Sequence, residues 1–215
     1  MNAINHAATA LLIKKRWPSV PIVAALISVQ LIEFLWVVFN LLGIEETTTA
    51  PEVTSISDIH LAHMPFSHSV FATFFISLAA WFAFSKLLHK PIWGTAIAIG
   101  IFSHILLDIA THTQDIEILP FVDWPAIGIG LYGIPILALV IETLYGIFCW
   151  WIFKGSKALL AIILTFNLAA LSFYVPQVSG PETLLAGQPK MFACVILIHI
   201  IAGLFVVAYF SEKRK

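Results

Sequence analysis

Three ionisable residues recur at every fourth position of an apolar stretch, SHILLDIATH, at residues 103–112. They are His104, Asp108 and His112. In a helix, residues at i, i+4 and i+8 lie along one stripe, so the three side chains are expected to point the same way. Imidazole nitrogens and carboxylate oxygens are ligands for zinc, manganese and iron. The spacing therefore predicts a stripe that could bind a metal.

A second group of the same residue types occurs in DIHLAHMPFSHSV, at residues 58–70, and consists of Asp58, His60, His63 and His68. Because Pro65 separates His63 from His68, the two need not share a helical face; a corner between a loop and a helix could aim both inward. Ser67 is a candidate N-cap for the helix that follows. His60 is expected to be a solvated loop residue.

The composition indicates that these groups lie in a membrane protein. Hydrophobic residues make up 60 % of the chain and charged residues 11 %, whereas soluble domains have about 25 % charged residues. About 20 apolar residues suffice for a helix to cross a bilayer core of roughly 30 Å. Six runs of this kind occur, at Pro18–Gly43, Phe66–Leu88, Pro91–Thr111, Trp124–Phe153, Lys157–Val175 and Met191–Phe210.

The predicted fold is therefore an all-α membrane protein, with about six transmembrane helices in one bundle and a short amino-terminal helix. No repeat or linker divides residues 1–215, so one polytopic domain is expected. The fourth run is unusually long and contains Pro125 and Pro135, which predict a kink or break near its start.

Charged residues segregate among the connections between these runs. One set of connections is basic, with Lys14, Lys15, Arg16, Lys86, Lys90, Lys154, Lys157, Lys213, Arg214 and Lys215. The alternate set holds Glu45, Glu46, Glu52, Asp58, Asp115, Glu117, Asp123 and Glu182, with Lys190 as its one base. Since basic loops stay in the cytoplasm, both termini are expected there and the loop Ile44–Pro65 outside. The segregation concerns topology; it predicts the lipid bilayer as a partner and no nucleic acid.

Depth along the helices brings further residues to one layer. Counted at about 1.5 Å per residue, the three acidic residues inside the runs, Glu33, Asp108 and Glu142, share a layer with His68 and His104. A carboxylate that faced lipid would cost several kcal/mol, so these groups should face the bundle interior. Because crowded carboxylates repel and no Lys or Arg reaches that depth, we expect a divalent metal as the counter-charge.

Four segments together resemble the YdjM-type family of bacterial inner-membrane proteins, which are predicted metal-dependent hydrolases. The segments are NAINHAATALL, VQLIEFLW, HMPFSHS and SHILLDIATH. The resemblance covers roughly residues 1–145, and residues 146–215 match only as additional helices. Many family members have Pro-Asp-x-Asp where this chain reads Gln30-Leu31-Ile32-Glu33, so the chain looks like a divergent subgroup.

That family is in turn similar to zinc-dependent phospholipases C and related single-strand nucleases, whose helical sites use a His-x-x-x-Asp motif. The resemblance implies a zinc centre, with manganese or iron as alternatives, in which His104 and Asp108 are central ligands and Asp108 could bridge two metals. Glu33 and His63 or His68 would complete a site, and His6 would reach a further metal. By the depth count His6 lies only about 12 Å above Lys14, so this ligand requires a re-entrant or tilted helix.

The predicted function is a membrane-embedded metal-dependent hydrolase of phosphoester bonds in a lipid or lipid-linked substrate. A metal-activated water would attack, with Glu142, Asp58 or His112 as base or supporting residue, and Asp115 lies close enough to His112 to enter the mouth of the site. The alternatives are a divalent-metal or proton transporter and a non-catalytic membrane protein with a structural metal. Clustering at one depth, without an inverted repeat, argues against a transporter. An open coordination position would favour the enzyme.

Overall fold

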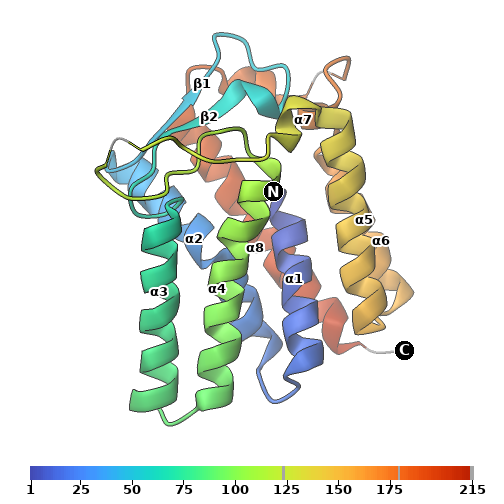
Figure 1. Ribbon diagram of the computed structural model, residues 1–215. Coiled ribbons are helices and arrows are strands. Elements are labelled where there is room, and N and C mark those ends of the chain that lie inside the picture. The colour runs from blue at the N-terminus through green and yellow to red at the C-terminus, as the bar shows by residue number, and fades with distance from the viewer. Residues whose placement is uncertain (123, 179, 214–215) are drawn as a thin grey trace.

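The computed structural model describes residues 1–122, 124–178 and 180–213. It is a bundle of helices with a small hairpin at one end (Figure 1). The helices are α1 (Ala3–Arg16), α2 (Ile22–Leu42), α3 (Val70–Phe82), α4 (Pro91–Thr111), α5 (Pro135–Phe153), α6 (Lys157–Ala169), α7 (Leu171–Tyr174) and α8 (Pro189–Glu212). A π-helical turn, Ala83–Leu87, extends α3, and short 3-10 turns occur at Ile56–Asp58, Leu131–Gly133 and Pro181–Leu185. Asp123, Arg214 and Lys215 lie outside the described residues.

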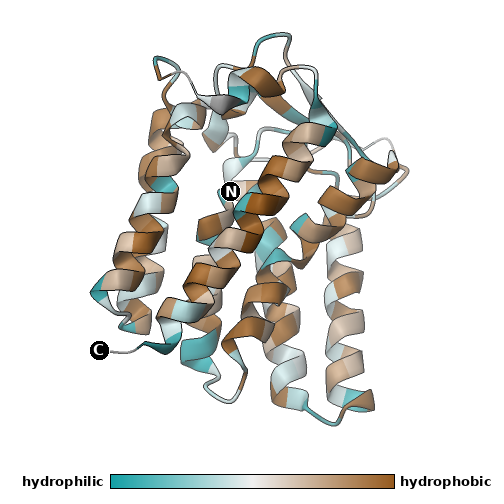
Figure 2. Cartoon of the chain, turned by 180° about the vertical axis from the view of Figure 1, so that it is seen from behind, coloured by the Kyte–Doolittle hydropathy of each residue, from teal (hydrophilic) through white to brown (hydrophobic). Residues whose placement is uncertain are grey.

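The expected all-α membrane bundle with an amino-terminal helix is confirmed. Within the described residues, five helices are long and apolar enough to cross a membrane: α2, α3 with its π-helical turn, α4, α5 and α8. Their outward faces carry large apolar side chains, and Figure 2 shows this apolar character along α8, which crosses the front of that view. α6 is apolar but has only 13 residues.

Two of the six expected spans differ from the helices observed. The fourth run does break near its start: the segment from Pro125 to Ile134 holds one 3-10 turn, and the helix begins only at Pro135. Gly130 there adopts φ +86°, a left-handed conformation that favours glycine. The fifth run is interrupted at Ala170, which separates α6 from α7.

α1 fills the centre of the bundle, where it contacts α2, α4, α5, α6 and α8. Every residue from Ile4 to Leu11 is buried. The small side chains of Ala7, Ala8 and Ala10 let neighbouring helices approach closely. The Asn2 side chain accepts a hydrogen bond from the Ile4 amide and so caps the helix. Met1 therefore lies inside the bundle, with its amino group 2.6 Å from Asp108 Oδ1.

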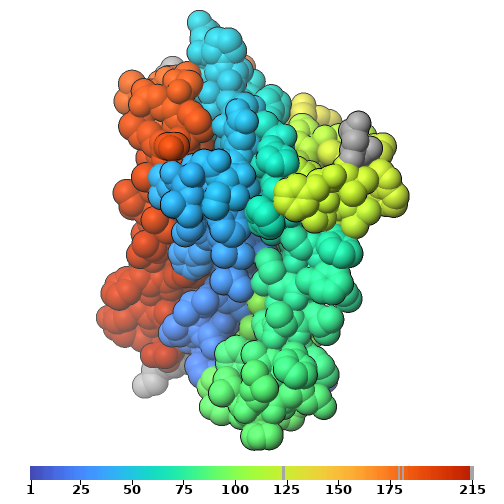
Figure 3. Space-filling view, turned by 90° about the vertical axis from the view of Figure 1, so that its left-hand side faces the viewer, coloured from blue at the N-terminus to red at the C-terminus, as the bar shows by residue number. Residues whose placement is uncertain are grey.

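The charged connections do separate onto opposite ends of the bundle. The ends of α1 and α8 and the turns α3–α4 and α5–α6, which carry the basic residues, lie at the lower end in Figure 1. The acidic connections lie at the upper end with the antiparallel hairpin of β1 (Glu46–Thr49) and β2 (Ile59–His63). Figure 3 shows the segment between the two strands rising above the helices.

The hairpin is fastened to the helices by polar side chains. The Trp36 indole of α2 donates to Thr47 Oγ1 at 3.0 Å, and the Thr47 amide donates to Asn40 Oδ1 at 3.0 Å. From the α4–α5 connection, Asp115 Oδ2 accepts from the Leu61 amide and Glu117 Oε1 from the Met64 amide. The hairpin is thus held over the upper end of α2 and α4.

Candidate metal centre

Five of the predicted ligands come together, from three helices and one corner: His6 of α1, Glu33 of α2, His68 before α3, and His104 and Asp108 of α4. His104 Nε2 lies 3.0 Å from Asp108 Oδ2 and 3.3 Å from Glu33 Oε2. His68 Nε2 lies 3.5 Å from Glu33 Oε2 and 3.6 Å from Asp108 Oδ2. All are buried except Glu33, whose side chain is 20 % exposed.

The tautomer of His104 is fixed from behind. Its Nδ1 lies 2.8 Å from the carbonyl oxygen of Val29, and because a carbonyl can only accept, the proton must be on Nδ1. In the neutral ring Nε2 therefore presents a lone pair to the carboxylates. Among the described residues, neither His104 Nε2 nor Asp108 Oδ2 has a hydrogen-bond partner, although both atoms are buried.

His68 is oriented by a chain of two residues. Glu45 accepts from the amides of Phe66 and Ser67 with Oε1 and from the Ser67 hydroxyl with Oε2. Since that hydroxyl has one proton, Ser67 Oγ must accept from His68 Nδ1, which lies 3.0 Å away. His68 Nε2, like that of His104, is left with a lone pair toward Glu33 and Asp108.

Sequence reasoning missed this use of Glu45 and Ser67. The sequence pattern indicates a loop charge at Glu45 and a helix cap at Ser67, but Ser69 is the residue that caps α3, through the Ala72 amide. The only local sign of this role is that Ser67 directly precedes the candidate ligand His68 in the sequence. The carboxylate comes from the turn between α2 and β1, 22 positions earlier, and no local pattern indicates it.

The converging atoms form two overlapping sets of three potential ligands. The ligand atoms of Glu33, His68 and His104 all lie within 4.8 Å of one another, and so do those of His6, His104 and Asp108, so each set could hold a divalent cation. Each set offers two imidazole nitrogens and one carboxylate oxygen, which suit zinc, manganese or iron. A protonated His68 or His104 ring could also pair with the Glu33 and Asp108 carboxylates. Metal analysis of the purified protein distinguishes this ion pair from a bound metal.

His6 approaches the opposite side of Asp108. Its Nε2 lies 3.1 Å from Asp108 Oδ1, and its ring stacks on His104 with 3.9 Å between centroids. The Met1 amino group lies 2.6 Å from the same oxygen. Asp108 thus presents Oδ2 toward His68 and His104, while its Oδ1 is paired with the Met1 ammonium and the His6 ring.

The buried helix α1 brings His6 to Asp108, which the depth count did not allow. The depth count fell short because Lys14 does not mark the surface of the bundle. Its Nζ donates to the carbonyls of Pro18 and Val20, so the side chain folds into the α1–α2 turn.

His63 and Asp58 do not join the cluster. His63 lies on β2 with a side chain that is 52 % exposed, and its Nδ1 is 3.4 Å from Glu117 Oε1. Asp58 closes a turn by accepting from Thr54 and the Ser55 amide. Partial burial acts to raise the pKa of Asp58, but these hydrogen bonds outweigh it and hold the pKa below its usual value. Residues 59–63 form a strand that the sequence did not predict, and the strand keeps His63 away from the interior.

Glu142 is buried but is engaged in holding α1. Its Oε2 accepts from the Asn2 amide at 2.7 Å and from Asn5 Nδ2 at 3.1 Å, and its Oε1 accepts from the Tyr174 hydroxyl at 3.1 Å. Asn5 also exchanges hydrogen bonds with Asn167 of α6. Glu142 therefore neutralises the amino-terminal end of α1, where a carboxylate is favourable, and does not face the converging nitrogens.

His112 follows the last turn of α4 and pairs with Asp115, whose Oδ1 lies 3.3 Å from His112 Nδ1. Its ring centroid is 6.2 Å from that of His68. Burial acts to raise the pKa of Asp115, but the contact with His112 and the bond from the Leu61 amide lower it below its usual value. An ionised Asp115 would keep the Nδ1 proton in place, so that Nε2 is free for proton transfer.

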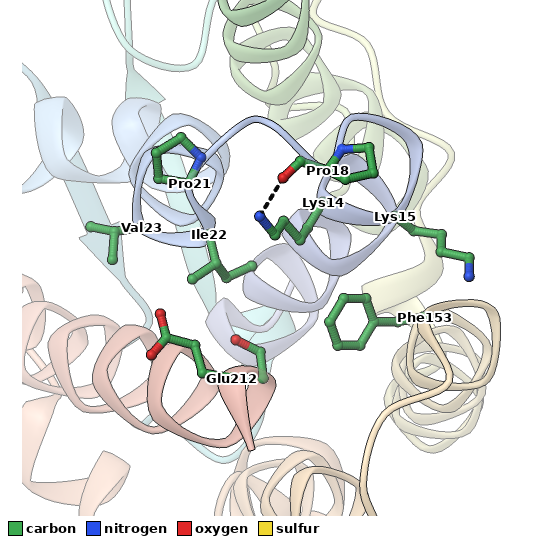
Figure 4. A pocket seen from close by; sticks show the side chains of 9 residues that line it. Lys14, Lys15, Pro18, Pro21, Ile22, Val23, Phe153 and Glu212 are labelled. Atoms are coloured by element: carbon green, nitrogen blue, oxygen red, sulfur yellow. Dashed lines mark hydrogen bonds between the residues drawn. The ribbon is translucent and has the colours of Figure 1, made fainter. Parts of the chain in front are cut away.

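A cavity of about 230 Å³ adjoins the cluster. Glu33, His68, Asp108 and His112 line one end of it, together with Tyr132. A second cavity, of about 540 Å³, lies at the basic end beside the α1–α2 turn (Figure 4). In the described part of the chain, groups of three potential metal ligands occur only at the first cavity.

Comparisons of the chain with family models, with curated proteins and with solved structures found no match.

Proposed function

We propose that this chain is a membrane-embedded metal-dependent hydrolase that cleaves phosphoester bonds in a lipid or lipid-linked substrate. The observation that carries the proposal is the position of the ligands at one end of a cavity. Glu33, His68 and Asp108 all line it, so the centre has an open side. A structural metal would be enclosed by its ligands, whereas a catalytic one keeps a position for water or substrate. The resemblance to the YdjM-type family supports the same proposal.

His68, His104, Glu33 and Asp108 would hold the ion, with His6 on the far oxygen of Asp108. A bound divalent ion would supply a water of lowered pKa and draw charge from a phosphoryl oxygen. Hydrolysis joins the oxygen of water to phosphorus and breaks the bond from phosphorus to the leaving oxygen, which must receive a proton. His112 is the candidate for carrying that proton, because it lines the cavity and Asp115 fixes its Nδ1.

We also propose that the basic end of the bundle is cytoplasmic, in accordance with the positive-inside rule. The cluster and its cavity would then lie in the outer half of the membrane, where a lipid headgroup could approach. Location in a bacterial inner membrane is what the family resemblance implies.

The test combines metal analysis with two assays on one preparation. We expect purified protein to hold zinc, manganese or iron in fixed ratio, and Asp108→Ala and His104→Ala to lose most of it. Chelation should abolish phosphoester hydrolysis, and added metal should restore it. His104→Ala should lower kcat at least about a hundredfold. His89→Ala, in the exposed α3–α4 turn at the other end of the bundle, should change neither the metal content nor kcat.

The same preparation, reconstituted in vesicles, tests the transporter. Full metal content in Asp108→Ala would contradict the metal centre. Metal flux without hydrolysis of any phosphorylated lipid would contradict the enzyme.

A further inference from the structure

The cavity beside the metal centre has two chemically different ends. One end carries the carboxylates and imidazoles described above. The other is walled by apolar side chains, among them Ala170 and Phe173 on one side and Phe192 and Ile196 on the other. A ligand that fills it must therefore be charged at one end and apolar at the other.

The mouth of this cavity lies between α6–α7 and α8. Of the described side chains that line it, only Ala169 of α6 and Val195 of α8 are exposed. Ring contacts between the two segments lie on either side of Ala169 and Val195. The ring centroids of Phe166 and His199 are 5.0 Å apart, and those of Phe173 and Phe192 are 6.3 Å apart. The break between α6 and α7 falls at the small residues Ala169 and Ala170, which both line the cavity.

The surroundings of the mouth are apolar. Leu168, next to Ala169, is 65 % exposed, and Ile198, near Val195, is 68 % exposed. Both helices belong to the apolar part of the bundle, and α8 is long enough to cross a membrane. In a membrane-embedded bundle, this mouth would face the hydrocarbon layer.

His199 is the one ionisable residue on the apolar wall of the cavity that the structure describes. Its Nε2 is buried and has no hydrogen-bond partner among the described residues. Because buried polar atoms are nearly always paired, this nitrogen is a candidate to bond a polar atom of a ligand.

We propose that the substrate is an acyl-ester phospholipid that enters sideways between α6–α7 and α8. Its phosphate lies at the metal centre, its acyl chain leaves through the gap at Ala169 and Val195, and His199 hydrogen-bonds an oxygen of the ester linkage. An isoprenoid phosphate has no oxygen beyond its phosphate and would leave His199 unpaired. This inference rests on the proposed function and adds the substrate class to it.

Ala169→Trp tests the chain path by filling the gap, and Ala161→Trp, on an exposed position of α6 away from the cavity, is its control. We expect Ala169→Trp to lower kcat/KM for a long-chain phospholipid about tenfold or more and to leave a water-soluble nitrophenyl phosphoester within about twofold. His199→Phe should raise KM for the phospholipid about tenfold and leave an isoprenoid phosphate unchanged.

A second readout does not depend on turnover. A phospholipid with a photoactivatable group in its acyl chain should cross-link to residues 195–199 in the wild-type protein and in Ala161→Trp, and not in Ala169→Trp. Cross-linking that Ala169→Trp leaves intact, or an equal loss of activity toward soluble and lipid substrates, would overturn the chain path. If the wild-type protein hydrolyses neither substrate with any metal, the proposed function fails and this inference with it.

Discussion

At the scale of single residues, the centre depends on which nitrogen of each histidine carries a proton. For His68 that choice is made by Glu45 through Ser67. Ser67→Ala and Glu45→Gln should each weaken metal affinity about 10–100-fold, because such supporting bonds orient the ligand. Metal titration of the purified variants measures this, and Glu46→Gln, an exposed neighbour, is the matched control. Unchanged affinity in both variants would show that the chain of bonds does not matter.

His112 and Asp115 carry a separate prediction, since they touch the cavity without joining either set of potential ligands. His112→Asn should lower kcat about 10²–10⁴-fold because proton transfer to the leaving oxygen is lost. Metal content should stay at the wild-type level, and His60→Asn, an exposed residue of the hairpin, should leave both quantities unchanged. Loss of metal in His112→Asn would reassign the residue to metal binding.

The sequence predicted contacts most directly where both partners lie on the same helix. His104 and Asp108 are four apart and meet at 3.0 Å, as the helical stripe predicted. His68 and His63 were equivalent from sequence, because nothing local showed that one would lie in a strand. The roles of Glu45 and Glu142 depend on contacts with distant segments, which a single sequence does not contain.

At the scale of helices, the spacing of α2 and α4 sets the distance between Glu33 and His104. Gly100 lies one turn before His104 and faces Ser28: a Cβ on Gly100 would overlap Ser28 Oγ and lie 2.9 Å from Ser28 Cβ. Gly100→Ala should therefore push the helices apart and weaken metal binding about tenfold or more, although neither residue is a ligand.

The double variant Gly100→Ala with Ser28→Gly removes the clashing side chain and should recover most of the affinity. Metal titration and thermal unfolding of the three proteins provide the measurement. If Gly100→Ala binds metal as the wild type does, helix spacing does not control the centre.

Helix limits were predictable where local chemistry marks them. The third expected span, Pro91–Thr111, coincides with α4, since proline is favourable in a first helical turn. The start of α5 was placed too early because the preceding segment is apolar and looks like membrane helix, although glycine and proline make it a loop. The interruption at Ala170 has no glycine or proline to mark it.

At the scale of the whole molecule, orientation is the property to test. With Cys149 and Cys194 replaced, a cysteine introduced at Thr48 of the hairpin should react with a membrane-impermeant reagent added from outside intact cells. A cysteine at Lys154, on the opposite end, should react only after the cells are opened. The reverse pattern would invert the orientation and place the centre in the cytoplasmic half.

Composition and charge pattern were sufficient to predict a membrane bundle and the separation of charged connections. They could not place the amino-terminal segment, because hydropathy treats Ala3–Arg16 as too short and too polar to belong inside. Its burial follows from pairing: Asn5, His6 and Thr9 each find polar partners on other helices. Such pairing is visible only once the bundle is assembled.

The burial of α1 also bears on biosynthesis. A helix with Asn5, His6 and Thr9 on its surface gains little from lipid alone, so we expect its place in the bundle to depend on polar partners from other helices. Its partners on α5 and α6 are synthesised more than a hundred residues later. We therefore expect α1 to reach its place late, with His6 meeting Asp108 only when the later helices have gathered. Metal capture in this protein would then mark the end of assembly.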